Sequence, residues 1–264
     1  MSAWRSLDAE LEQWREAGRS PSFWLRDDDA CRDSAALQRL LAIAETAGLP
    51  VALAAIPAAL EASLIDTVAR SHFATVIQHG YAHRNHALPH ERKMELGLHR
   101  GADAAVAELA RGLDTLRERF GERFAAVLVP PWNRIADEIV ARLPAVGLRG
   151  LSTLGPRKAR CPAAGLLQCN AHVDVIDWRR NREFIGDEAA VDRLVAHLRA
   201  RRDGGADPDE PTGLLTHHLD MTEGAWRFVA ALITRTREHG AAWIGVRDAF
   251  GSAECAGVTS GRSA

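Results

Sequence analysis

The sequence is poor in cysteine, and this limits the kinds of site it can build. It has 264 residues but only four cysteines, none of them in a C-x-x-C pair. Their scatter disfavours a structural zinc site of the thiolate type and a dithiol redox motif. We therefore expect Cys31, Cys161, Cys169 and Cys255 to be unpaired thiols in a reducing compartment.

The sequence also lacks a charge excess and a long hydrophobic run. Its formal net charge of -2 gives no reason to expect a nucleic acid or an anionic membrane surface as partner. No stretch approaches the roughly 18 uncharged apolar residues that a membrane-spanning helix needs. The first twenty residues carry acidic side chains early and no apolar run, unlike a secretory signal, so we expect a cytoplasmic location.

What the sequence does contain is an alternation of short apolar runs with helical patterns. The runs are continuous, as in strands buried on both faces, and this favours a parallel sheet with helical crossovers. The number of units predicts an α/β barrel of about seven parallel strands. We place the barrel at residues 21–250, after an N-terminal helix at 1–20 that packs on it, and before a flexible tail at 251–264. A helical pattern over residues 91–120 is weakened by three glycines.

Two polar clusters follow strands of this predicted barrel. "RDDDA" at residues 26–30 places three carboxylates side by side, and "QHGYAHRNH" at residues 78–86 contains three of the 11 histidines. The aspartates could simply lie in a solvated loop that caps the next helix, and the histidines in a surface turn. If the loop forms one helical turn, His79 and His83 lie on one face within reach of a single zinc ion. His83 and His86 are the alternative pair.

The positions of the clusters favour a common site. In an α/β barrel the carboxyl ends of the strands face one cavity, so distant segments converge there. Two histidines and one aspartate would hold a divalent metal with open positions for water and substrate. The spare carboxylate could then act as general base, and His217 or His218 as general acid.

These residues resemble the first two motifs of the polysaccharide deacetylases of carbohydrate esterase family four. The family's T-F-D-D-G motif is similar to "WLRDDDA", which makes Asp28 the expected base and Asp29 the expected metal ligand; a register shifted by one gives Asp27 and Asp28. The family's H-[ST]-x-x-H motif is similar to "HGYAH". The resemblance implies that His79 and His83 are the other metal ligands, and that the fold is a distorted (β/α) barrel.

The later motifs are matched less closely. Val129 in "VPPWN" stands where the family has an arginine that orients the base, and Arg26 is our candidate replacement. The backbone N–H near Trp132 would help to form an oxyanion hole. "DVIDW" resembles the family's D-x-x-D-W stretch and "LLTHH" its L-x-H motif. The resemblance implies His217 as the general acid, with His218 as the fallback. It implies a substrate groove lined by Trp132, Asn133, Asp177, Trp178 and His218.

The resemblance implies a hydrolase acting on non-peptide carbon–nitrogen bonds. Zn²⁺, or another divalent transition metal, would activate a water molecule that removes the acetyl group from an N-acetylated sugar. Two alternatives remain open at this point. The same barrel could hydrolyse another small linear or cyclic amide, or it could be a catalytically silent protein that binds glycans. The departures from the family motifs indicate a divergent branch.

Overall fold

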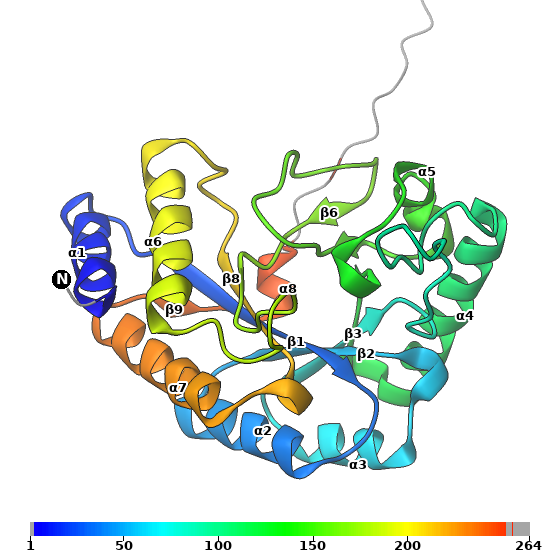
Figure 1. The fold of residues 1–264 in the computed structure, drawn as a ribbon, viewed down its shortest axis with the longest axis horizontal. Helices are drawn as coiled ribbons and strands as arrows, with labels where there is room; N and C mark the ends of the chain where they lie inside the picture. Colours follow the sequence, from blue (N-terminus) through cyan, green and yellow to red (C-terminus); the bar gives the residue numbers. More distant parts are fainter. Residues whose placement is uncertain (1–2, 252–254, 256–264) are drawn as a thin grey trace, which may run out of the picture.

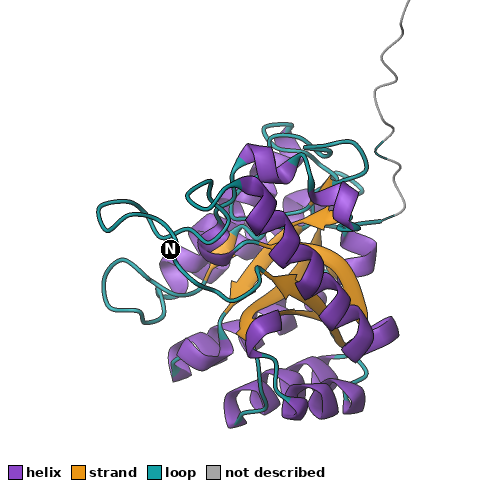
Figure 2. Cartoon of the chain, turned by 90° about the vertical axis from the view of Figure 1, so that its right-hand side faces the viewer, coloured by secondary structure: helices purple, strands orange, loops and turns teal. Residues whose placement is uncertain are grey.

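A curled parallel sheet forms the centre of the computed structural model, which describes residues 3–251 and 255. Its strands follow the order β6-β5-β4-β3-β2-β1-β8-β7, and β9 pairs with β1 beside this path. All the strand pairings are parallel. The longer helices wrap the outside of the curl (Figures 1 and 2). The predicted α/β barrel of parallel strands is therefore confirmed, in a distorted form.

The elements have the following bounds. The strands are β1 Ser22–Ala30, β2 Val51–Ala55, β3 Ala74–His79, β4 Phe124–Val129, β5 Gly150–Leu151, β6 Leu167–Gln168, β7 Val173–Asp174, β8 Thr212–Thr216 and β9 Ala242–Trp243. The α-helices are α1 Ala3–Glu16, α2 Ala35–Ala47, α3 Ala62–Arg70, α4 Ala102–Phe120, α5 Asp137–Val140, α6 Asp187–Asp203, α7 Glu223–Glu238 and α8 Val246–Ala249. Short 3₁₀ turns lie at Pro57–Ala59, Gly121–Arg123, Pro131–Asn133, Leu143–Val146 and His218–Asp220.

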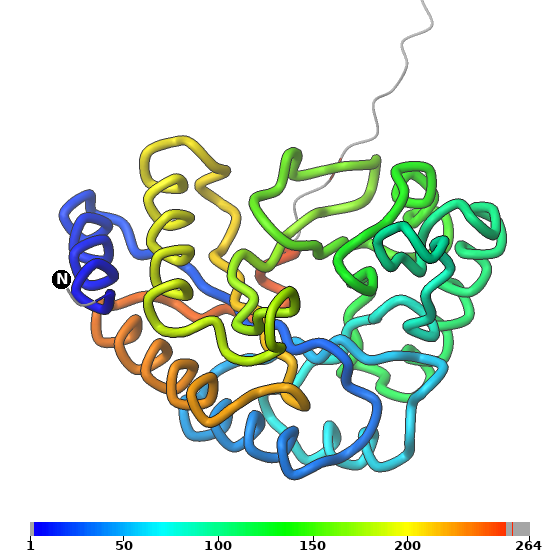
Figure 3. The backbone as a smooth tube through the Cα atoms, viewed as in Figure 1, coloured from blue at the N-terminus to red at the C-terminus, as the bar shows by residue number. Residues whose placement is uncertain are grey.

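Local signals explain several of these bounds. The Ser34 hydroxyl accepts a hydrogen bond from the backbone N–H of Leu37 and so caps α2, which ends at Gly48 in the left-handed conformation. The N-terminal helix α1 runs beside α6 (Figure 3), and the Trp14 indole donates to the carbonyl of Leu198. No described helix has the length and apolar character needed to cross a membrane.

The predicted helix at residues 91–120 is wrong in its first part. The helix α4 begins only at Ala102, after Gly101 at φ 79°. The preceding segment is a loop because Glu95, although acidic, is buried and turned toward backbone amides near residue 82. A tertiary contact of this kind overrides helical propensity.

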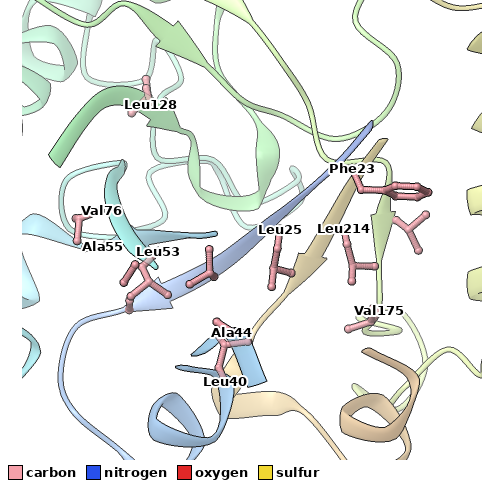
Figure 4. Packing of buried hydrophobic residues seen from close by; sticks show 14 of the residues in the cluster. Phe23, Leu25, Leu40, Ala44, Leu53, Ala55, Val76, Leu128, Val175 and Leu214 are labelled. Atoms are coloured by element: carbon pink, nitrogen blue, oxygen red, sulfur yellow. The ribbon is translucent and has the colours of Figure 1, made fainter. Parts of the chain in front are cut away.

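Apolar side chains from both layers form the main core. Leu25, Leu53 and Leu214 lie on adjacent strands, and Leu40 and Ala44 of α2 pack beneath them (Figure 4). All five are almost fully buried. The inner face of the curl is filled mostly by small and β-branched residues and by the ring of Trp24, which Phe250 meets edge-on. This packing fixes the strands whose carboxyl ends carry the polar clusters.

The cysteines do not all remain free, which corrects our expectation. Cys161 and Cys255 form a disulfide across 94 residues of sequence, while Cys31 and Cys169 are free. The two segments approach only through the fold, so the spacing of the cysteines gave no signal of the pairing. A disulfide is typical of oxidising compartments and does not favour the cytoplasmic location that we expected. Most of the predicted tail lies outside the described residues.

The core packing predicts the effect of a truncation in β8. Leu214→Ala should lower the free energy of unfolding by about 2–5 kcal/mol, because it leaves a cavity between β1 and β7. Leu88→Ala is the matched control, since Leu88 is 51% exposed; it should change stability by less than about 0.5 kcal/mol. Urea unfolding followed by circular dichroism measures both. Equal losses would contradict the assignment of this core.

Candidate metal centre and its surroundings

The end of β1 directs its three aspartates to three different partners. Alternation along the strand places Arg26 and Asp28 on one face and Asp27 on the other. The pairing of β1 with β2 then shifts register between Asp27 and Ala30, which adds one residue to β1, and Asp29 takes a left-handed φ of 69°. This bulge brings Asp29 next to the histidines without moving Asp28 away from Arg26.

Asp29, His79 and His83 form a compact cluster. The Asp29 Oδ1 atom lies 3.1 Å from His79 Nε2 and 3.3 Å from His83 Nε2. The rings of the two histidines are 5.1 Å apart. Of the registers considered from the sequence, the structure brings together Asp29 with His79 and His83.

The tautomer of His79 makes the chemistry of this cluster suitable for a metal. His79 Nδ1 lies 3.0 Å from the Val129 carbonyl oxygen, which can only accept, so Nδ1 carries the proton. The Nε2 atom of the neutral ring therefore presents a lone pair toward the Asp29 carboxylate. Two acceptors at this distance repel each other unless a cation lies between them. A divalent metal with nitrogen and oxygen ligands satisfies all three groups, so the residues fit the metal that the sequence predicted.

The pKa shifts in the cluster agree with a demand for positive charge. Burial raises the pKa of Asp29, but the hydrogen bond and charge of His79 outweigh it and hold that pKa well below its usual range. Burial lowers the pKa of His79, but the charges of Asp28 and Asp29 outweigh it, so this pKa is raised. Without a metal, a proton on His79 takes the place of the cation.

The loop that carries His83 does not form the helical turn that was one condition for bringing His79 and His83 together. Gly80 and His83 both have positive φ, 55° and 53°. The buried carboxylate of Glu95 accepts hydrogen bonds from the backbone N–H groups of Tyr81 (3.1 Å) and Ala82 (2.8 Å) and so fixes the loop. A Cβ atom on Gly80 would lie 2.0 Å from Glu95 Oε2, so this position requires glycine.

Arg26 occupies the place beside Asp28 that we expected of it. Its fully buried guanidinium lies 3.0 Å from both carboxylate oxygens of Asp28. It also donates to Asn133 Oδ1 at 2.7 Å and to Ser152 Oγ at 2.8 Å. Asn133, which the resemblance placed in the substrate groove, thus holds Arg26. A buried charge pair with this many partners fixes the orientation of Asp28.

Two tryptophans border the cluster. Trp132, at φ 56°, packs its ring 4.5 Å from that of His83. The ring of Trp178 meets that of His217 edge-on at 4.6 Å, and its indole N–H donates to Asp174 at 2.8 Å. Trp132 thus lies beside the candidate metal ligand His83, and Trp178 beside the candidate acid His217. Their contact with a substrate, which the resemblance implied, remains a prediction.

His217 and Asp174 complete the site on the far side. His217 Nε2 is 4.0 Å from Asp28, and its Nδ1 is 3.8 Å from Asp174. Sequence reasoning missed Asp174 because it extended the strand through Trp178, whereas β7 ends at Asp174. Burial raises the pKa of Asp174 against the lowering effect of His217. Asp177 lies outside this contact, and its carboxylate accepts from the backbone N–H groups of a turn at residues 179–180.

His218 is directed toward Asp27 and not toward the cluster of Asp29, His79 and His83. Its Nδ1 lies 2.5 Å from Asp27 Oδ1, and its side chain is almost fully buried. His217 is extended after β8 and faces Asp28 and Asp174, whereas His218 begins a 3₁₀ turn and faces Asp27. The substrate-lining position that we expected for His218 is therefore not where the structure places it.

A second group of possible ligands, His172, His197 and Glu210, does not fit a metal. The backbone N–H of Gly213 donates to His172 Nδ1 at 2.9 Å, so the neutral ring carries its proton on Nε2. That Nε2–H points toward Glu210, 3.5 Å away. A bound metal would require this nitrogen to lose its proton, so the group is a buried polar contact between α6 and the loops beside β8.

The cluster predicts which side chains a metal needs. Asp29→Asn, His79→Ala and His83→Ala should each weaken zinc binding by at least about 10-fold, because each removes one of three ligands. His86→Ala is the matched control and should leave the affinity unchanged. Isothermal titration of the metal-free protein with zinc measures this. A loss of affinity in His86→Ala with none in His79→Ala would select the other histidine pair.

Zinc affinity should also depend on pH in a defined direction. The proton and the metal compete for His79 Nε2, and the pKa of His79 is raised. Affinity should therefore fall as pH decreases from about 8 to about 6. The same titration in buffers of different ionisation enthalpy reports the protons released. An affinity that does not change over this pH range would contradict the competition between the proton and the metal for His79 Nε2.

Comparisons with known proteins found relatives by structure but none by sequence. No protein-family model and no curated protein matched the chain.

Solved structures, in contrast, are similar over most of its length. A protein provisionally named a polysaccharide deacetylase from Mycobacterium smegmatis has a TM-score of 0.66 and 16% identity, over 88% of this chain and 90% of that one. The catalytic domain of a peptidoglycan N-acetylglucosamine deacetylase from Eubacterium rectale has a TM-score of 0.55 and 13% identity, over 87% and 90%. A carbohydrate esterase family four pseudoenzyme from Bacillus anthracis has a TM-score of 0.56 and 14% identity, over 88% of this chain and 66% of that one. The chain thus has the fold of the polysaccharide deacetylases.

Proposed function

We propose that the protein is a metal-dependent hydrolase that removes the acetyl group from an N-acetylated sugar. The observation that carries the proposal is that a two-histidine, one-aspartate cluster lies beside Asp28 and His217 at the carboxyl ends of the strands. Asp29, His79 and His83 would hold the metal. When bound, Zn²⁺ or a similar ion supplies Lewis acidity for the amide carbonyl and for water.

The protein side chains would divide the proton transfers between them. Asp28, oriented by Arg26, takes a proton from the attacking water. His217 lies 3.8 Å from Asp174 and within 4.0 Å of Asp28. It would donate a proton to the leaving amine on the other side of the substrate. Asp174 is a positioning residue in this scheme, since it contacts the His217 ring and the Trp178 indole and not the reacting atoms.

The catalytically silent alternative loses its main argument. The best reason for it was the missing motif arginine, and pseudoenzymes of this fold exist. Arg26 reaches Asp28 from the same strand, so the carboxylate does not lack a cationic partner. Buried charges cost free energy unless they are paired, and a silent site has no physical reason to keep them. Hydrolysis of another small amide would use the same side chains. A comparison of substrates distinguishes this alternative from deacetylation of a sugar.

The proposal predicts a contrast between the two aspartates of "DVIDW". With a panel of N-acetylated sugars and small cyclic amides, and acetate or amine release as readout, Asp28→Asn and His217→Ala should lower kcat by at least about 100-fold. Asp174→Asn should lower kcat and shift its pH profile, while Asp177→Asn should not change it. Zinc content should stay near that of the unaltered protein in all four variants. Activity that survives Asp28→Asn in full would overturn the mechanism.

A further inference from the structure

A cavity lies along the ends of β4, β5 and β6, beside the residues that hold Arg26. Its volume is about 510 Å³, within the range of small-molecule sites. Asn133 and Thr153 line it, and both contact the Arg26 guanidinium beside Asp28. The cavity is therefore separated from Asp28 by no more than the Arg26 side chain and its two partners. A substrate whose acetamide reached Asp28 would extend its remaining groups into this space.

Cationic side chains gather at this cavity from three separate loops. Arg134 and Lys158 line it. Arg134 donates to the Lys93 carbonyl at 2.8 Å, and Lys93 Nζ lies 6.0 Å from the ring of Trp132. Burial, then the charges of Arg92 and Arg179, lowers the pKa of Arg134. Arg134 and Lys158 thus place two cationic groups on the wall of one cavity.

These cations are not neutralised by the protein. Over residues 3–251, no carboxylate lies within ion-pair distance of Arg92, Arg134 or Lys158, nor of Arg179. Asp137 also lines the cavity, but it is exposed and bonds neither cation. Elsewhere arginines are paired, as Arg39 is with Glu223 and Arg100 with Glu108. Like charges held together without counter-charge are stabilised by an anionic ligand.

We propose that the substrate carries an anionic group, a phosphate or a carboxylate, beside its N-acetyl group, and that Arg134 and Lys158 bind this anion in the cavity. This inference rests on the proposed function, because it assumes that the substrate is an N-acetylated sugar. A guanidinium binds either anion through paired hydrogen bonds, and the ammonium adds a point charge. The neighbouring Arg92 and Arg179 raise the local concentration of anions by their field.

The test compares one sugar with and without a negative charge. Zinc-loaded protein is titrated calorimetrically with N-acetylglucosamine, N-acetylglucosamine 1-phosphate and N-acetylmuramic acid. At least one anionic sugar should bind about 10-fold more tightly than the neutral one, and the preference should shrink between about 50 mM and about 500 mM salt. The phosphate and the carboxylate arms show which anion the cavity prefers.

Two variants decide where the anion binds. Arg134→Gln should reduce the preference to less than about 3-fold, since it removes the lining guanidinium. Arg5→Gln, on the exposed side of α1, should keep it. Equal binding of all three sugars, no binding by any of them, or a preference that persists in Arg134→Gln would overturn the proposal; the last result would place the anion on the metal. Acetate release is measured separately. A preference for anionic sugars without deacetylation would contradict the proposed function but would still support the anion site.

Discussion

The site depends on one electrostatic constraint: a lone pair of His79 Nε2 faces the carboxylate of Asp29. The Val129 carbonyl fixes the proton of His79 on Nδ1, and so leaves Nε2 with a lone pair 3.1 Å from the Asp29 carboxylate. This arrangement is unstable unless a cation is present. The surrounding features, from the bulge in β1 to the buried Glu95, hold these atoms in place.

The fold supplies that arrangement through the geometry of parallel strands. The core between the sheet and the helices fixes β1, β3 and β8 relative to one another, so their carboxyl ends meet at one edge. Alternation along β1 then sends Asp27 to His218 and Asp28 to Arg26. One added residue turns Asp29 toward the histidines. Three adjacent carboxylates thus avoid mutual repulsion because each has its own cationic or hydrogen-bonding partner.

Most of the fold could be predicted from the sequence, because alternating apolar runs and helical patterns are local signals. Because polar residues at the carboxyl ends of parallel strands lie near one another, the sequence also indicated that the aspartate and histidine clusters would lie close together. What failed depends on contacts between distant residues. The loop at His83 is shaped by Glu95, which sequence periodicity placed in a helix. The choice of Asp177 over Asp174 followed from a strand drawn too long, and the disulfide joins cysteines 94 residues apart. Such contacts have no signature in the local pattern.

The coordination of zinc in the loaded protein tests the central claim most directly. X-ray absorption at the zinc edge reports the ligand atoms and their distances. The account predicts one zinc per chain with two imidazole nitrogens at about 2.0–2.1 Å and at least one oxygen, and no sulfur. It also predicts that the spectrum loses one imidazole in His83→Ala. A sulfur ligand, or a spectrum unchanged by that substitution, would contradict it.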